Sequence, residues 1–429
     1  MSRERVSFRV LRAWARSAIA IFYRSVEVTE AEPMPVGRPT IFAVNHQSAL
    51  GDVAIVVAVR PELPHFLAAS SWWKRAPARV LFQLGGVVPV YRNNDGSGTR
   101  ANVSTFTACH AALADGAQLC IFPEGEMHLG QGLLPLKTGV ARIALGAATD
   151  AGLEGVVVVP LGLIYESMGR FRSDVEVRVG VPVEVDAWTD ANNTDHHTAV
   201  RAFTEAVRAS LEDAIVAPSG DDAAMLDRSA VMSLSDSGVS FAERNGLRRR
   251  LRAARFDDLG ALRDAVHEHA FHLHAIGLED GDALEPISPT ARRRLGSEVA
   301  ILSVPAAIGA VANAPMLALV WVAATRAPDE GWHATVKGVG GTFLLPLTWI
   351  GEWALLSKRM PRRRAAAVVA TGAVCGWAAL AWRDRFQQLR RVRRVDSLNR
   401  SRADEMRDAR KSRDEVRALV QQIVGEELC

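Results

Sequence analysis

Short runs of apolar and β-branched residues alternate with helix-like stretches from about residue 38 to residue 215. Runs of this kind predict five strands, at residues 40–44, 86–91, 117–122, 156–164 and 175–179. The intervening residues 99–114 and 138–148 are predicted to be helices. Because residues 156–159 are continuously apolar, that strand is expected to be covered on both faces. The pattern predicts an α/β domain over residues 31–215, with a mixed central sheet and flanking helices.

Residues 1–30 show a different periodicity. On a helix, four arginines share one face and five apolar residues share the opposite face. The two sets are Arg5, Arg9, Arg12 and Arg16, and Val6, Val10, Trp14, Ala18 and Ile21. This is typical of a basic amphipathic helix in a membrane interface, although a surface helix docked on its own domain fits equally well. The apolar run at residues 18–23 is too short for a secretory signal.

Three long uncharged runs follow after residue 298. The first covers residues 299–325, the second residues 339–351 with an extension to 356 after Glu352, and the third residues 365–382. Each run approaches or exceeds the length of helix that is needed to cross a bilayer, so residues 298–382 are predicted to be membrane-embedded helices. Residues 216–297 are expected to be a helical extension, and residues 383–429 a charged cytoplasmic helix.

The flanking charges give a partial topology. Arginines 292–294 precede the first run and a basic cluster at residues 358–364 follows the second, whereas the loop between them carries Asp329 and Glu330. The positive-inside rule then makes the first two runs a hairpin with cytoplasmic ends, and the α/β domain is expected on the cytoplasmic side of the cell membrane. A third crossing would place eight arginines outside, so a re-entrant or interfacial third segment is expected. The final helix can contact anionic headgroups, stay solvated or form a coiled coil.

Composition narrows the class of protein. The formal net charge is +3, and no nucleic-acid motif accompanies the basic stretches, so no nucleic-acid partner is expected. Four cysteines without a CxxC pair argue against a disulfide-built secreted protein. The histidine-rich stretch 267–274 fails the HExxH zinc pattern because Phe271 stands where histidine is needed. His269 and His272 could still share a ligand, but a partner-facing helix is favoured, and neither metal nor cofactor is expected.

The chemistry begins at residues 44–52, where His46 follows a predicted strand and Asp52 stands six positions later. The carboxylate can hold one ring nitrogen protonated and orient the other as a base, which can deprotonate an alcohol that attacks a thioester. Neither Cys109 nor Cys120 matches a nucleophile pattern, and no GxSxG elbow occurs.

Further blocks follow in order at other strand ends. Arg92 closes the block 85–92 and is suited to grip a phosphate. The block 122–126 contains Glu124 and Gly125, residues 134–139 contain Lys137, and residues 158–162 contain Pro160. Active sites of open α/β sheets lie at the carboxyl ends of strands, so these blocks are expected to meet.

Together the blocks resemble the four motifs of the glycerolipid acyltransferase family, which includes glycerol-3-phosphate and lysophosphatidate acyltransferases, over roughly residues 30–185. The sequences of residues 137–144 and 165–173 also resemble those of family members. The resemblance implies that His46 is the general base and Asp52 its orienting partner. It implies a substrate site formed by Asn45, Ser48, Arg92, Glu124, Gly125, Lys137 and Pro160, in which Arg92 and Lys137 bind phosphate and Pro160 shapes the acyl-donor side.

Two departures from the family pattern stand out. Five residues separate His46 from Asp52, where four are commonest, and this longer spacing resembles a subset with a C-terminal apolar region. Glu126 stands where many members have a small hydroxyl residue, and its carboxylate would repel a phosphate unless Arg92 or Lys137 offsets it.

The expected protein is therefore a membrane-bound O-acyltransferase. Its expected partners are acyl-CoA or acyl-carrier protein, a phosphorylated glycerol or lysophospholipid acceptor, and membrane lipids. Two alternatives stay open: acylation of another lipid or glycolipid alcohol, and an inactive lipid-binding scaffold.

Overall fold

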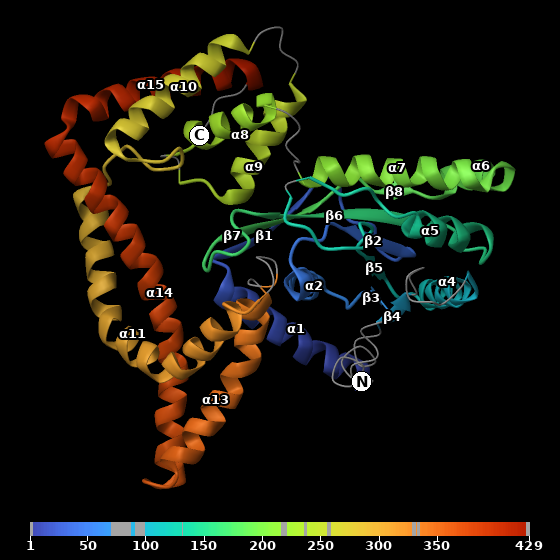
Figure 1. The fold of residues 1–429 in the computed structure, drawn as a ribbon, viewed down its shortest axis with the longest axis horizontal. Coiled ribbons are helices and arrows are strands. Elements are labelled where there is room, and N and C mark those ends of the chain that lie inside the picture. The colour runs from blue at the N-terminus through green and yellow to red at the C-terminus, as the bar shows by residue number, and fades with distance from the viewer. Residues whose placement is uncertain are drawn as a thin grey trace. The chain divides into compact units, whose positions relative to one another are not determined.

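A computed structural model describes residues 3–69, 87–90, 99–130, 132–215, 221–235, 238–254, 259–327, 332 and 335–425 (Figure 1). The chain forms two compact units. The first contains Met1–Ala217 and Ala324–Thr342, and the second contains Pro218–Ala323 and Phe343–Cys429.

The first unit is built on a mixed sheet of eight strands within the described residues, in the order β1-β7-β6-β2-β5-β3-β4, with β8 paired to β6. The strands are β1 (Ser25–Glu30), β2 (Thr40–Val44), β3 (His65–Ala69), β4 (Val88–Val90), β5 (Leu119–Ile121), β6 (Val157–Tyr165), β7 (Asp174–Val179) and β8 (Val183–Glu184). β2 runs parallel to both β5 and β6, whereas β6 runs antiparallel to β7 and β8. The predicted α/β fold with a mixed central sheet is thus confirmed.

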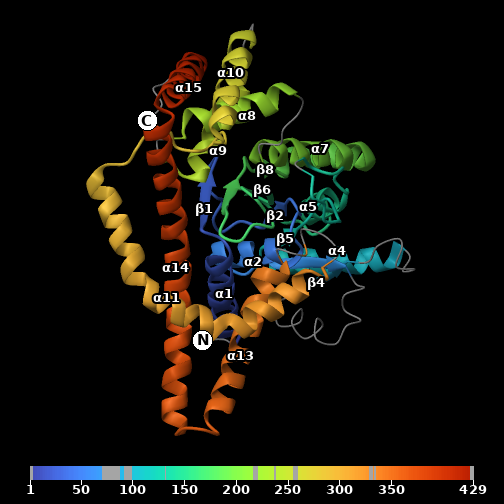
Figure 2. The same ribbon diagram turned by 60° about the vertical axis from the view of Figure 1, so that its left-hand side comes forward.

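Helices cover both faces of this sheet (Figures 1 and 2). The helical segments of this unit among the described residues are α1 (Arg3–Phe22), α2 (Ala49–Val59), α4 (Thr99–Ala114), α5 (Gly139–Thr149), η3 (Asp186–Trp188), α6 (Thr189–Thr194), α7 (His196–Ile215) and η4 (Val336–Gly340). Side chains alternate along β2. Phe42 and Val44 pack with α1 and α2, while Ile41 and Ala43 pack with α4, α5 and α7. This alternation explains why all five residues of β2 are buried and apolar or small.

Helix α1 is docked on its own domain through Ala15, Ala18 and Phe22, which are almost fully buried. Arg16 Nε also donates a hydrogen bond to Ala58 O of α2, at 3.1 Å. Val10, on the stripe predicted to be apolar, is 65% exposed. The helix ends at Phe22 and residues 25–30 are a strand, so the segment predicted as one helix of 30 residues is in fact a helix followed by β1.

The second unit contains a helical core and three long apolar helices. The core is formed by α8 (Asp221–Ser233), α9 (Phe241–Ala253), α10 (Gly260–Ile276) and α15 (Ala403–Val424). Ser240 and Glu243 form a reciprocal capping box at the start of α9. Val416 and Val420 of α15 are fully buried in this core, so the last helix belongs to a folded bundle.

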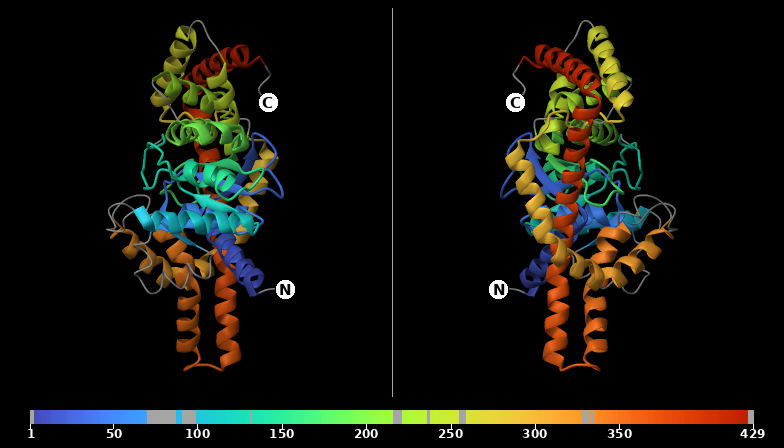
Figure 3. Two further views of the ribbon diagram at one scale, coloured as in Figure 1. Left: turned by 90° about the vertical axis from the view of Figure 1, so that its right-hand side faces the viewer. Right: turned by 90° about the vertical axis from the view of Figure 1, so that its left-hand side faces the viewer.

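The apolar helices are α11 (Pro289–Ala324), α13 (Gly341–Leu356) and α14 (Arg362–Ser401). In the described part of the chain, Pro289–Ala324, Val336–Leu356 and Arg362–Ser401 are long and apolar enough to cross a membrane. Figure 3 shows α13 and α14 as neighbouring helices joined at one end. Asn313 of α11 donates to Gly372 O of α14 at 3.3 Å and accepts from Trp349 Nε1 of α13 at 3.1 Å. Helix α14 continues through residue 383, where the charged helix was expected to begin.

Candidate active site

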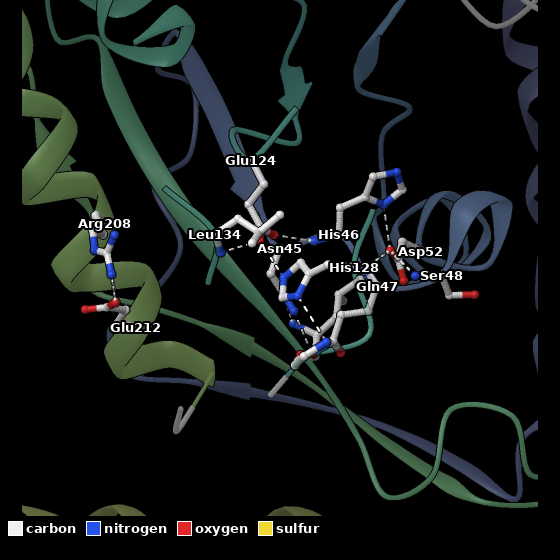
Figure 4. Close-up of polar contacts among 12 residues, drawn as sticks. Asn45, His46, Gln47, Ser48, Asp52, Glu124, His128, Leu134, Arg208 and Glu212 are labelled. Atoms are coloured by element: carbon white, nitrogen blue, oxygen red, sulfur yellow. Dashed lines mark hydrogen bonds and ion pairs between the residues drawn. The ribbon is translucent and has the colours of Figure 1, made fainter. Parts of the chain in front are cut away.

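The candidate site lies at the edge of the sheet where the parallel strands β2, β5 and β6 end (Figure 4). His46 follows β2, Glu124 follows β5, and Tyr165 is the last residue of β6. The register of the three strands brings these side chains together, since carboxyl ends of parallel neighbours share one edge.

His46 and Asp52 are in direct contact. His46 Nδ1 lies 2.8 Å from Asp52 Oδ2, with the imidazole 19% exposed and the carboxylate fully buried. Because a carboxylate only accepts hydrogen bonds, Nδ1 is assigned the proton and Nε2 keeps its lone pair. The ring also stacks on Phe122, with centroids 4.2 Å apart. The arrangement presents a partly exposed, oriented imidazole nitrogen that can act as a general base.

The loop before α2 holds Asp52 in place. The backbone N–H groups of Gln47 and Ser48 each donate to Asp52 Oδ2 at 2.8 Å. Asp52 lies in the first turn of α2, where the positive end of the helix dipole favours a carboxylate. A Cβ at Gly51 would lie 2.4 Å from Ser48 Oγ, so a larger residue there would force the buried Ser48 side chain to move.

Asn45 is buried and uses its amide on the neighbouring strand. Asn45 Nδ2 donates to Leu163 O at 3.0 Å, and Leu163 N donates to Asn45 Oδ1 at 2.7 Å. This pair of bonds continues the β2–β6 ladder beyond the end of β2. Ser48 is also fully buried, at the N-cap of α2. Both residues therefore stand behind His46 and fix the path of its backbone.

Glu124 is fully buried and binds the main chain of the same loop. Its Oε1 accepts from His46 N and its Oε2 from Leu134 N, both at 2.8 Å. His128 Nε2 lies 2.6 Å from Glu124 Oε2, at ion-pair distance, and His128 N donates to His46 O at 3.2 Å. Glu124 and His128 thus bind the backbone N–H and the backbone carbonyl of His46, respectively (Figure 4).

Gly125 and Lys137 meet beside Glu124. Gly125 has φ +74°, and a Cβ there would lie 3.2 Å from Lys137 Cγ. Lys137 N donates to Pro123 O at 2.7 Å, which ties the two blocks together, while the Lys137 side chain is exposed. A non-glycine residue at 125 would meet both backbone strain and the lysine stem.

The remaining predicted residues lie elsewhere. Pro160 is buried inside β6 opposite Ala43, within the sheet and not at the edge where His46 lies. Arg92 lies outside the described residues. His269, considered as a ligand, is buried against Ser412, with Nδ1 2.9 Å from Oγ.

Sequence reasoning did not assign His128 or Tyr165 to the site. His128 stands four residues after Glu124 in the same block, and Tyr165 opens a block that carried the family resemblance. The Tyr165 hydroxyl donates to Asp52 Oδ1. Their positions in these sequence blocks were the only hint that they belong to the site. Nothing in the neighbouring sequence indicates that His128 contacts Glu124 or that Tyr165 contacts Asp52.

Parts of the chain are similar to known acyltransferases. Residues 25–164 match the family model described as Acyltransferase. Glycerol-3-phosphate O-acyltransferase 2 of Saccharomyces cerevisiae is 41% identical over 85 residues, which cover 20% of this chain and 11% of the yeast protein. A 1-acyl-sn-glycerol-3-phosphate acyltransferase of Chlamydomonas reinhardtii is 28% identical over 154 residues, 35% of this chain and 42% of the algal protein. The 1-acyl-sn-glycerophosphate acyltransferase PlsC from Thermotoga maritima covers 48% of this chain and 80% of its own, at 20% identity and TM-score 0.36.

The mixed sheet, the His–carboxylate pair at its edge and the family match define residues 25–164 as an acyltransferase domain. Over parts of its length the chain is similar to glycerol-3-phosphate and 1-acyl-sn-glycerol-3-phosphate acyltransferases. The match spans only 10–11% of the length of the two yeast relatives.

Proposed function

We propose that this protein is a membrane-bound O-acyltransferase that moves a fatty acyl group from an acyl thioester to a hydroxyl of glycerol-3-phosphate or lysophosphatidate. The observation that carries the proposal is the contact of 2.8 Å between His46 Nδ1 and Asp52 Oδ2 at the carboxyl edge of the sheet. The printed names of the relatives from yeast and Chlamydomonas support the two acceptors.

In the proposed reaction His46 Nε2 takes the proton of the acceptor hydroxyl while its oxygen attacks the thioester carbonyl carbon. The carbon–sulfur bond then breaks, the protonated His46 returns its proton to the leaving thiolate, and the products are an ester and a free thiol. Asp52 orients the imidazole and stabilises its charged form between the two steps. No covalent enzyme intermediate and no cofactor are needed.

The proposed substrate contacts involve the other residues of the motif blocks. Lys137, exposed beside Gly125, is proposed to bind the acceptor phosphate, together with Arg92. The exposed Glu126 in the same loop requires such cations to offset its charge. Asn45, Ser48 and Glu124 are proposed to act through the backbone of the His46 loop, and Pro160 on the acyl-donor side through the shape of β6.

The proposed location is the cell membrane, with the acyltransferase domain on the cytoplasmic side. The three apolar helices support membrane insertion. The basic residues 292–294 and 358–364 at the ends of the first two apolar segments support the orientation. Both acyl-CoA and acyl-carrier protein present the required thioester.

An acyl-transfer assay on membranes tests the proposal. Radiolabelled acyl-CoA and acyl-carrier protein are each offered with glycerol-3-phosphate or lysophosphatidate, to wild type, His46→Ala and His274→Ala. General-base catalysis contributes about 10²–10⁴ in rate, so His46→Ala should lose activity by that factor. His274 is exposed in the second unit, and its variant serves as the matched control.

Product from one acceptor, lost only in His46→Ala, supports both the reaction and the substrate. Activity of His46→Ala within a few-fold of wild type would overturn the mechanism. No product from any donor and acceptor pair would overturn the substrate assignment and favour another lipid alcohol or a scaffold.

A further inference from the structure

The two oxygens of Asp52 have different surroundings. Oδ2 faces three donors, His46 Nδ1 and the backbone N–H groups of Gln47 and Ser48. Oδ1 accepts a hydrogen bond from the hydroxyl of Tyr165, which comes from a strand 113 residues later in the chain. Three bonds to one oxygen leave the carboxylate able to turn about that oxygen. A donor on the other oxygen fixes the carboxylate plane.

A second tyrosine stands behind the first. The rings of Tyr23 and Tyr165 lie 5.9 Å apart, and Tyr23 is almost fully buried, so its ring packs against that of Tyr165. Burial, and then the negative charge of Asp52, raise the pKa of both tyrosines far above the ordinary value. Both hydroxyl groups therefore keep their protons at neutral pH.

Tyr23 is fixed by the end of helix α1, which it directly follows. Arg172 N donates to Phe22 O at 2.7 Å, and Arg172 Nη1 donates to Ala20 O at 2.7 Å and to Tyr23 O at 2.8 Å. Arg172 adopts φ 65°, a conformation that costs free energy for a non-glycine residue. The clamp satisfies carbonyl groups that the helix end leaves open.

We propose that Tyr165 and Tyr23 are positioning residues for the acyl transfer: Tyr165 fixes the orientation of Asp52, Tyr23 fixes Tyr165, and the end of α1 is thereby part of the active-site support. This inference rests on the proposed function of His46 and Asp52. It gives the N-terminal helix a second role, since a displacement of its last turn reaches the catalytic carboxylate through the ring contact of Tyr23 with Tyr165 and the hydrogen bond of Tyr165.

A double-mutant cycle between Tyr165 and Asp52 tests the inference. Tyr165→Phe keeps the ring and removes the hydroxyl, so kcat should fall about 10- to 100-fold, the range for one hydrogen bond to a charged group, with KM within twofold. In an Asp52→Ala background the hydroxyl has no carboxylate to orient, so Tyr165→Phe should cause no further loss. Tyr23→Leu, which removes the ring packed against Tyr165, should lower kcat about two- to fivefold.

Thr204→Val is the matched control. It deletes a buried hydroxyl of the same domain that bonds only within helix α7, to Val200 O at 2.7 Å, as far as the described residues show. Its kcat should stay within twofold of wild type. Equal losses from Tyr165→Phe in the wild-type and Asp52→Ala backgrounds would overturn the inference, because the tyrosine would then act independently of Asp52.

A second readout does not depend on turnover. The rate at which diethyl pyrocarbonate modifies His46 at one fixed pH, followed by mass spectrometry, reports how nucleophilic the free ring nitrogen Nε2 is. With the carboxylate no longer fixed in Tyr165→Phe, the bond from Nδ1 to Asp52 weakens and Nε2 becomes a poorer nucleophile, so the rate should fall, whereas Thr204→Val should keep the wild-type rate. Equal rates in Tyr165→Phe and wild type would overturn the positioning role. The expected fall in rate in Tyr165→Phe, together with no product from any acceptor in the wild type, would overturn the proposed function alone.

Discussion

At the scale of single residues, the buried carboxylates of Asp52 and Glu124 hold the loops of the candidate site in place by accepting backbone hydrogen bonds. Glu124 was expected to contact the acceptor, yet both its oxygens receive backbone N–H groups, from His46 and Leu134. A buried carboxylate with several donors is stable where it lies, because each bond is charge-assisted. Its position supports a role in setting where the His46 backbone runs, one step away from the substrate.

The variant Glu124→Gln distinguishes a role in binding the acceptor from a role in supporting the His46 backbone. The glutamine amide can accept one backbone N–H but turns its own NH₂ group toward the other, which leaves a buried donor unpaired at a cost of about 1–3 kcal/mol. We expect a lower unfolding temperature and a lower kcat, with little change in KM for the phosphorylated acceptor. Steady-state kinetics and thermal unfolding measure both quantities.

The neighbouring Glu126 is exposed and provides the control for stability. Glu126→Gln should keep the wild-type unfolding temperature. A Glu124→Gln protein of normal stability and kcat but raised KM would show instead that Glu124 binds the acceptor directly.

At the scale of elements, local pattern and tertiary context compete. Strand β2 and helix α4 have the bounds predicted for them, and β6, β7 and α5 differ by a residue at one or both ends. Helix α2 was not predicted because its sequence, ALGDVAIVVAV, is rich in β-branched residues that favour strands. Packing against α1 and the sheet overrides that preference. Strand β1 was missed because it lies at the sheet edge, paired only with β7 among the described strands.

The pair α10 and α15 carries a buried histidine with a measurable consequence. Burial lowers the pKa of His269 to about 4, and outweighs the attraction of Asp280. In the unfolded chain the pKa returns to about 6.5. The unfolded state therefore binds more protons as pH falls from about 6.5 to about 4, and the free energy of unfolding drops by about 3 kcal/mol across that window.

Hydrogen exchange of peptides from α10 and α15 at pH 7.5 and pH 5 measures this effect. Protection in the wild type should fall at the lower pH. His269→Gln stays neutral and can still bond to Ser412, so its protection should change less, whereas His274→Gln at an exposed position should behave as the wild type does. Equal pH dependence in wild type and His269→Gln would exclude His269 as the cause.

At the scale of the whole molecule, the second unit carries an apolar surface that water does not favour. Large apolar side chains are exposed along α11, α13 and α14. They include Ile301, Val304, Val311, Trp321, Leu347, Leu355, Val374 and Trp377. Inside this surface the polar Asn313 is satisfied by bonds to α13 and α14, as a membrane interior requires. The three helices together support an integral membrane protein.

Extraction of membranes with alkaline carbonate tests whether the protein is integral to the membrane. The full chain should stay in the pellet and be released by detergent. Val304→Arg with Val311→Arg should lower the retained fraction, because each arginine at a helix centre costs about 2.5–3.5 kcal/mol on insertion. Val10→Arg, on an equally exposed position of α1, should leave the fraction unchanged. Release of the wild type by carbonate would contradict membrane-spanning helices.

The sequence alone determined those features that depend on neighbouring residues. Strand and helix periodicity, the uncharged length of the three C-terminal runs, and the reach from His46 to Asp52 across one turn all act over a few residues. For this reason the α/β fold, the candidate membrane helices and the order of the motif blocks could be predicted before any coordinates.

Tertiary structure alone decided which distant groups meet. Glu124 reaches the backbone of His46 across 78 residues and Tyr165 reaches Asp52 across 113. Both contacts follow from the side-by-side register of β2, β5 and β6, which no local pattern specifies. The same register turns the amide of Asn45 onto Leu163 and keeps Pro160 inside the sheet. The candidate base His46 could thus be proposed from local sequence, whereas the set of groups that hold it in place is a property of the folded sheet.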